Sequence, residues 1–161
     1  MRKFLLTVVV ACMALFSTAS ASAQDEGFSL SGARAVGLRF GPDLSISYQQ
    51  NFREAMFLEA NLSFPYSFGG FGVDVTNNWL FNIGSSNFNW YAGVGAGVGF
   101  NWTTSYFELD LIPRIGIEYN FSGAPLQIAA DYKPAIGFIF GGDSAVGFAG
   151  YNFGLALRYR F

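Results

Sequence analysis

The stretch that decides the fold is residues 90–119, WYAGVGAGVGFNWTTSYFELDLIPRIGIEY. From Trp90 to Trp102 every second residue is Trp, Ala, Val or Phe, and the residues between them are mostly Gly. After the polar residues Thr103–Ser105, the alternation resumes from Phe107 to Tyr119, with charged residues and Gly on the second face. A period of two over ten or more residues is typical of β-strands. We therefore interpret this stretch as two antiparallel strands joined by a short turn.

The same alternation extends over most of the chain on both sides of this stretch. It recurs in residues 35–40, 44–49, 56–64, 71–83, 126–138 and 152–161. The breaks between these segments are rich in Gly, Pro, Asn, Asp and Ser, the residues that form tight turns. Eight alternating segments with short connections predict an all-β chain that forms one eight-stranded antiparallel up-and-down transmembrane β-barrel.

Residues 1–23 have the layout of a cleavable signal peptide. A basic start, Arg2 and Lys3, precedes the apolar run Phe4–Phe16, and small residues then end in the A-x-A site Ala21-Ser22-Ala23. The apolar run is shorter than the ~20 residues of a membrane-spanning helix, which argues against an anchor. Lipoprotein processing at Cys12 is a further alternative, and it leaves the A-x-A site unused. We predict a signal peptide over 1–23 and one barrel domain over 24–161.

The composition excludes several classes of function. Charged residues are 12% of the chain, about half the usual share of roughly 25%. Histidine is absent and the single cysteine is Cys12, so the predicted mature chain can hold no Ser-His-Asp triad, Cys-His pair, zinc site with nitrogen or sulfur ligands, or disulfide. Without Arg2 and Lys3, seven basic residues face eleven acidic ones, and this net charge of −4 argues against nucleic acid. We expect no catalytic residues, no metal and no cofactor.

The charged residues indicate which face of the strands is inside. Eleven of them share the small or polar face: Arg39, Glu59, Asp74, Glu108, Asp110, Arg114, Glu118, Asp131, Lys133, Arg158 and Arg160. The lumen of an eight-stranded barrel is barely wide enough for side chains, so it cannot hold Trp79, Trp90, Trp102 and more than a dozen Phe, Tyr, Leu and Ile. The apolar face must then point outward, toward lipid.

Buried charges persist when they are paired. We therefore predict that these eleven residues form a lumen charge network that leaves no wide pore. Tight turns would place Gly95 opposite Arg114, Gly99 opposite Asp110, and Arg114 opposite Asp131. Glu108 and Asp110 also form a carboxylate pair of the kind that glycosidases use, but a packed lumen offers such a pair no substrate cleft.

The last eight residues, GLALRYRF, resemble the C-terminal signal that the barrel-assembly machinery reads in bacterial outer-membrane proteins. Gly154, Leu157, Tyr159 and Phe161 carry this likeness. Together with the export signal and the alternation, the chain resembles the small outer-membrane barrels of the OmpX/OmpW-like, porin-like family. The resemblance implies a monomer in the outer membrane of a Gram-negative envelope, surrounded by lipid, with the assembly machinery as its partner during biogenesis.

Eight strands return the C-terminus to the side of the N-terminus, so both termini are expected in the periplasm. The loops at 41–43, 65–70, 102–105 and 141–145 are then external, and they are too short to favour an adhesin or a receptor. The leading hypothesis is a structural or envelope-maintenance barrel. The alternatives are a narrow channel for ions or small solutes, and a secreted soluble barrel that binds an apolar ligand.

Overall fold

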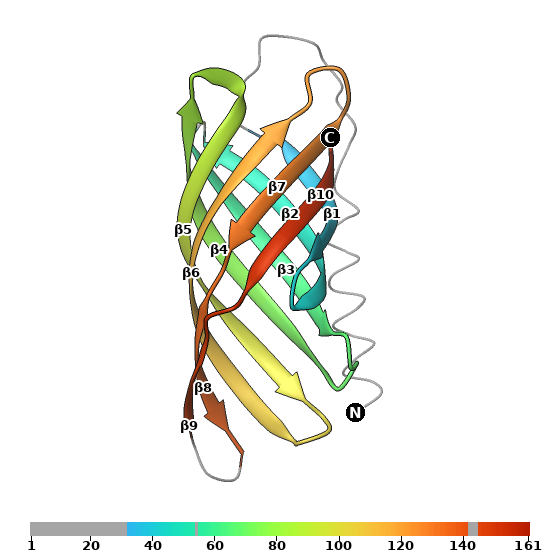
Figure 1. The fold of residues 1–161 in the computed structure, drawn as a ribbon, viewed down its shortest axis with the longest axis vertical. Helices are drawn as coiled ribbons and strands as arrows, with labels where there is room; N and C mark the ends of the chain where they lie inside the picture. Colours follow the sequence, from blue (N-terminus) through green and yellow to red (C-terminus); the bar gives the residue numbers. More distant parts are fainter. Residues whose placement is uncertain (1–31, 54, 142–144) are drawn as a thin grey trace.

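The computed structural model describes residues 32–53, 55–141 and 145–161, so the predicted signal peptide lies outside the described residues. Within the described ranges every regular element is a strand (Figure 1). The strands are β1 (Arg34–Phe40), β2 (Asp43–Arg53), β3 (Met56–Pro65), β4 (Gly70–Ile83), β5 (Ser85–Asn101), β6 (Tyr106–Asn120), β7 (Leu126–Tyr132), β8 (Ala135–Phe140), β9 (Ala145–Ala149) and β10 (Phe153–Arg160). No helix in these ranges is long and apolar enough to cross a membrane.

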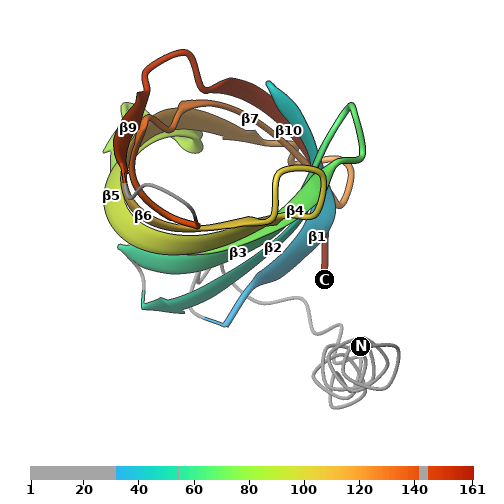
Figure 2. The same cartoon turned by 90° about the horizontal axis from the view of Figure 1, so that it is seen from below.

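Eight of the strands close into an antiparallel barrel, as the alternation predicts. The ring runs from β1 through β2, β3, β4, β5, β6 and β7 to β10, which pairs again with β1. Figure 2 shows this ring from one end, with β1 and β10 side by side. We call the pairing of β1 with β10 the seam, because it joins the first and last strands of the described chain. The register of the seam runs from Ala35 opposite Arg160 to Phe40 opposite Leu155.

One predicted strand, 126–138, is divided in two. Lys133 and Pro134 separate β7 from β8, and β6 pairs with β7 over Ile115–Asn120 and with β8 over Phe107–Leu111. Proline has no N–H to give to the ladder, so the strand is interrupted where it stands. The strand β9 (Ala145–Ala149) was not predicted, because its five residues offer only a short alternation next to a glycine-rich turn. Among the described strands β9 pairs with β8 alone, and the β8–β9 hairpin extends beyond β1 and β10 (Figure 1).

The two faces of the wall differ sharply in chemistry. Large apolar side chains on the outer face are solvent-accessible, as at Leu111 (48% exposed) and Val94 (46%). The inner face carries buried Ser, Thr, Asn, Gln and charged residues, with a few large apolar groups among them. Of these, Phe57 and Tyr91 pack edge to face with ring centroids 5.2 Å apart. The predicted assignment of the polar face to the interior is therefore correct.

The register of β5 against β6 differs by two residues from the prediction. Arg114 lies opposite Gly93, and Asp110 lies opposite Gly97. The reason is the loop, which spans the four residues 102–105 and is closed when Asn101 Oδ1 accepts hydrogen bonds from the N–H groups of Thr103 (2.9 Å) and Thr104 (3.0 Å). The predicted register of β6 against β7 is also wrong by two residues, because Asp131 lies opposite Gly116 rather than Arg114, although the Arg114 and Asp131 side chains do form an ion pair.

Candidate functional site

Arg114 links opposite walls of the lumen. It extends from β6 opposite Gly93, which has no side chain to obstruct it, and its side chain is fully buried. Its Nη1 lies 2.8 Å from Glu59 Oε2 on β3, and its Nη2 lies 2.6 Å from Asp131 Oδ2 on β7. The guanidinium also lies 5.2 Å from the centroid of the Tyr91 ring. One side chain thus connects two strands of the ring that are not neighbours.

Two further arginines extend this arrangement at both carboxylates. Asp131 Oδ1 accepts from Arg39 Nη2 at 2.6 Å, and Glu59 Oε2 lies 2.8 Å from Arg158 Nη2. The result is a series of alternating charges, which we call the ion-pair ladder: Arg39, Asp131, Arg114, Glu59 and Arg158. Each carboxylate in the ladder has two arginine partners, and all five side chains are almost completely buried.

Lys133 and Asp74 form a separate buried pair. Lys133 Nζ lies 2.7 Å from Asp74 Oδ2, and Asn61 Nδ2 donates to the other carboxylate oxygen at 3.0 Å. Lys133 stands at the break between β7 and β8, so this pair braces the interrupted wall against β4 and β3.

Glu118 is held by amides. Its carboxylate accepts from Gln127 Nε2 (3.0 Å), Asn120 Nδ2 (3.2 Å) and Asn89 Nδ2 (3.4 Å), and it is 2% exposed. Sequence reasoning considered only the charged residues and missed this group. The sequence did contain an indication of it. The amide residues lie on the same face of the strands as the charged residues, and a buried carboxylate needs hydrogen-bond donors.

The remaining predicted lumen residues lie apart from the ladder. Glu108 and Asp110 are half-buried near the end of the barrel that holds the loop 102–105, and their side chains contact each other. They converge above Gly137 on β8, whose lack of a side chain leaves them room. Arg160 is half-buried at the opposite end, where β10 ends. The structure thus brings five of the eleven predicted residues into one ladder, two into a second ion pair, and leaves four outside both.

The residues of the predicted assembly signal lie on both faces of β10. Leu157 and Tyr159 point outward, and Gly154 faces the lumen beneath the Arg39 guanidinium. Phe161 follows β10 and exchanges two backbone hydrogen bonds with Arg34, Phe161 N to Arg34 O at 2.9 Å and Arg34 N to Phe161 O at 3.1 Å. The two ends of the described chain are therefore joined by backbone hydrogen bonds.

Where the ion-pair ladder crosses it, the lumen is filled by buried side chains. A polar cavity at the end near Arg34 and Arg160, lined also by Glu118, Gln49 and Asn120, measures about 10 Å³, which is room for about one water molecule. Among the described residues, acidic side chains do not gather in a group of three that could hold a metal ion. The chemistry that the arrangement supports is structural: it neutralises buried charge across the barrel.

No family model, no curated protein and no solved structure matches this chain. Membership of the OmpX/OmpW-like family therefore stays a prediction.

Proposed function

We propose that this chain is an integral outer-membrane β-barrel with a structural or envelope-maintenance role, whose side-chain-filled lumen forms no wide pore. The observation that carries the proposal is the reversed polarity of the barrel. Arg39, Glu59 and Arg158 are at most 1% exposed inside, whereas Leu109 and Leu157 on the outer face are 40% and 51% exposed. Soluble proteins rarely expose an apolar surface of this extent, whereas lipid is its natural solvent.

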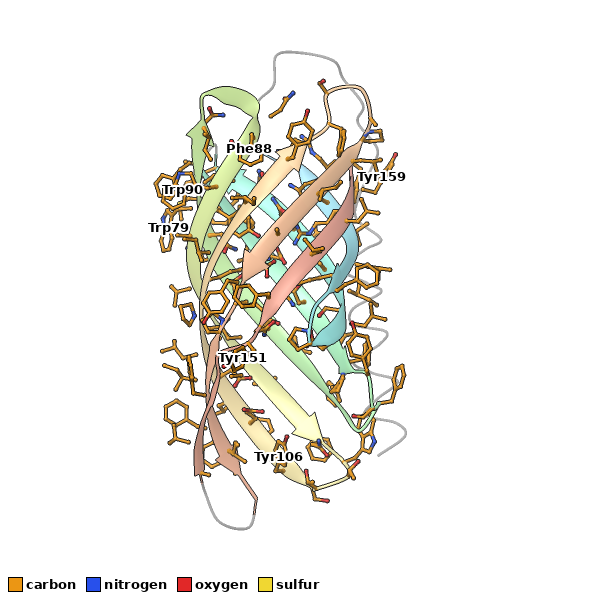
Figure 3. The ribbon with its side chains drawn as sticks, in the orientation of Figure 1. Trp79, Phe88, Trp90, Tyr106, Tyr151 and Tyr159 are labelled. Atoms are coloured by element: carbon orange, nitrogen blue, oxygen red, sulfur yellow. The ribbon has the colours of Figure 1, made fainter. Side chains whose placement is uncertain are left out.

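The aromatic residues support the same placement. Phe88, Trp90 and Tyr159 lie toward the end of the barrel that holds the C-terminus (Figure 3). On the outer face near this end, Phe81 stacks on Trp90 with centroids 4.2 Å apart, and Tyr119 packs against Phe121 at 4.9 Å. Aromatic side chains gather where a membrane meets water, because their rings are apolar and their N–H and O–H groups are polar.

The ion-pair ladder supports a closed lumen. Its members come from β1, β7, β6, β3 and β10, so its ion pairs span the interior from one wall to the other. An ion that crosses the barrel must separate these pairs, which costs several kcal/mol in a medium of low polarity. A soluble barrel that binds an apolar ligand requires the opposite lining, because its interior must be apolar and its exterior polar.

Location and permeability are tested separately. Fractionation of the native host, followed by gel electrophoresis with and without heating, should recover the chain in the outer membrane with a heat-dependent mobility. Recovery from the periplasm without detergent would overturn the membrane assignment. In planar bilayers the purified protein should show no stable conductance of porin size. Small discrete steps would favour the narrow channel, and a large stable conductance would contradict the filled lumen.

The orientation and the assembly partner belong to the same proposal. The bonds between Arg34 and Phe161 place both ends of the described barrel at one rim, which agrees with two periplasmic termini. A cysteine introduced at Thr104, in the opposite loop, should react with an impermeant thiol reagent on intact cells, whereas one at Gly123 should react only after the outer membrane is opened. Replacing Phe161 with Ser should slow assembly if the C-terminus is read by the assembly machinery.

A further inference from the structure

The seam is the pairing in this barrel that joins the two ends of the described chain. Most other pairings in the ring join strands that follow each other closely, but the seam closes β1 on β10. Only six residue pairs form its register. Bringing β1 and β10 together closes a chain segment that contains all the strands between them. This has an entropic cost that local hairpins do not have, and such long-range contacts form late in folding.

Arg158 crosses the seam in one direction. It stands on β10 directly opposite Gly37 on β1, and Gly37 stands opposite Ser47 on β2. Because Gly37 has no side chain, the Arg158 side chain reaches past β1, and its Nε donates to Ser47 Oγ at 2.9 Å. Its Nη2 continues to Glu59 on β3 at 2.8 Å. A residue of the last strand is thus held by the second and third strands.

Arg39 crosses the seam in the opposite direction. It stands on β1, and its guanidinium lies above Gly154 on β10, where a Cβ would lie 2.5 Å from Arg39 Nη2. Gly154 stands opposite Asp131 on β7, and Asp131 receives Arg39 Nη2 at 2.6 Å and Nε at 3.0 Å. A residue of β1 is thus held by β7, the neighbour of β10 on its other side.

We propose that Arg39 and Arg158 form a reciprocal latch that holds the barrel closed at the seam. Arg158 of β10 passes over Gly37 of β1 and bonds β2. Arg39 of β1 passes over Gly154 of β10 and bonds β7. These bonds can form only when β1 and β10 are paired, and they must break before the seam opens. The latch concerns closure of the ring and is independent of what surrounds the barrel.

Arg114 provides a matched control. It is equally buried and binds the same two carboxylates, Glu59 and Asp131, but it extends from β6 and crosses no seam. Replacement of any one of the three arginines with Met leaves both carboxylates with an arginine partner. The three variants therefore share the loss of a buried cation and differ in whether the lost bonds cross the seam.

The test places a removable crosslink across the seam. Leu38 and Leu157 lie directly opposite each other on the outer face of β1 and β10, so Leu38→Cys with Leu157→Cys can form a disulfide there. Leu62→Cys with Val73→Cys crosslinks the β3–β4 hairpin as a control. Both pairs are built in the full chain with Cys12→Ser, which removes its single native cysteine. Tryptophan fluorescence after a urea jump in detergent reports unfolding, before and after reduction.

Without crosslinks, R39M, R158M and R114M should each unfold at least about tenfold faster than the parent, because each loses buried ion pairs. The oxidised seam crosslink should return R39M and R158M to within about twofold of the parent carrying the same crosslink, and reduction should abolish the rescue. R114M should still unfold fast with the seam crosslink, and the hairpin crosslink should rescue none of the three.

Equal rescue of all three variants by the seam crosslink, or rescue of none, would overturn the latch. If a Met variant does not fold, R39K and R158K, which keep the charge but lose the fork of donors, should show the same pattern at smaller amplitude.

Discussion

Arg114 and Asp131 form a 2.6 Å ion pair although they do not face each other in the sheet, because Asp131 lies opposite Gly116. Both side chains point into the lumen and are fully buried, so the arginine reaches the carboxylate diagonally across the β6–β7 ladder. On its other side Asp131 meets Arg39, so a single carboxylate holds two arginines. Like Glu59, Asp131 is therefore a carboxylate that joins two arginines of the ion-pair ladder.

We predict that Asp131→Ala destabilises the barrel by about 3–5 kcal/mol, because it leaves two buried guanidinium groups with one carboxylate fewer. Removing one of those charges as well, in Asp131→Ala with Arg39→Met, should cost less than the sum of the two single changes. Equilibrium urea unfolding in detergent measures all three. The control is Asp110→Ala, which removes a half-buried carboxylate outside the ladder and should have a small effect. Simple additivity of the first pair would show that the two side chains are not coupled.

Val94→Arg should cost about 2–4 kcal/mol if the outer face contacts the middle of a bilayer. The side chain of Val94 points outward from the centre of β5, and it is 46% exposed. Folding into lipid vesicles, compared with folding into detergent, measures the cost of placing the charge. Thr104→Arg, in the loop between β5 and β6, is the matched control and should be neutral. A neutral Val94→Arg in vesicles is the result that excludes lipid from this face.

Gly154→Ala should destabilise the barrel by about 1–3 kcal/mol, because the added methyl group overlaps the Arg39 guanidinium. Gly123 lies in the loop after β6, and a Cβ there meets nothing within 4 Å, so Gly123→Ala serves as the control and should change little. Thermal unfolding compares the two substitutions. Combining Gly154→Ala with Arg39→Met should relieve part of the loss, since the overlapping group is then smaller and uncharged. Equal effects at both glycines would indicate that Gly154 acts through its backbone alone.

Glu118→Leu should be more damaging than Glu118→Gln. The leucine removes the acceptor of the Asn120 and Asn89 amides and one of the two acceptors of the Gln127 amide, which costs about 1–3 kcal/mol for each buried donor left unpaired. Glutamine keeps one acceptor oxygen and so preserves part of the network. Urea unfolding ranks the two variants against the parent. The reverse order would mean that burying the charge costs more than its hydrogen bonds return.

Much of the fold was predictable because it is encoded locally. In residues 90–119 the period of two identifies strands, and the glycines and charges of that stretch mark the face that turns inward. The lumen assignment followed from volume, because Trp90 and its aromatic neighbours cannot fit inside eight strands. Each of these inferences depends on residues that are close together in the sequence.

The register and the partners of each side chain were decided by the tertiary structure. The loop 102–105 has four residues, two more than the predicted register requires, and this places Gly93 rather than Gly95 opposite Arg114. Register is a cooperative property of turn geometry and ring closure, and no local pattern in β5 or β6 encodes it. The same holds for β9, whose five residues form a strand because β8 is there to pair with them.

By itself the sequence determined that this chain alternates, that it forms an eight-stranded antiparallel barrel, and that its charged face is inside. Only the tertiary structure decided that Arg39 reaches Asp131 and that Arg158 reaches Glu59 across the seam. The physical reason is that periodicity is fixed by neighbours along the chain, whereas an ion pair across a closed ring exists only once the two ends of the chain have met.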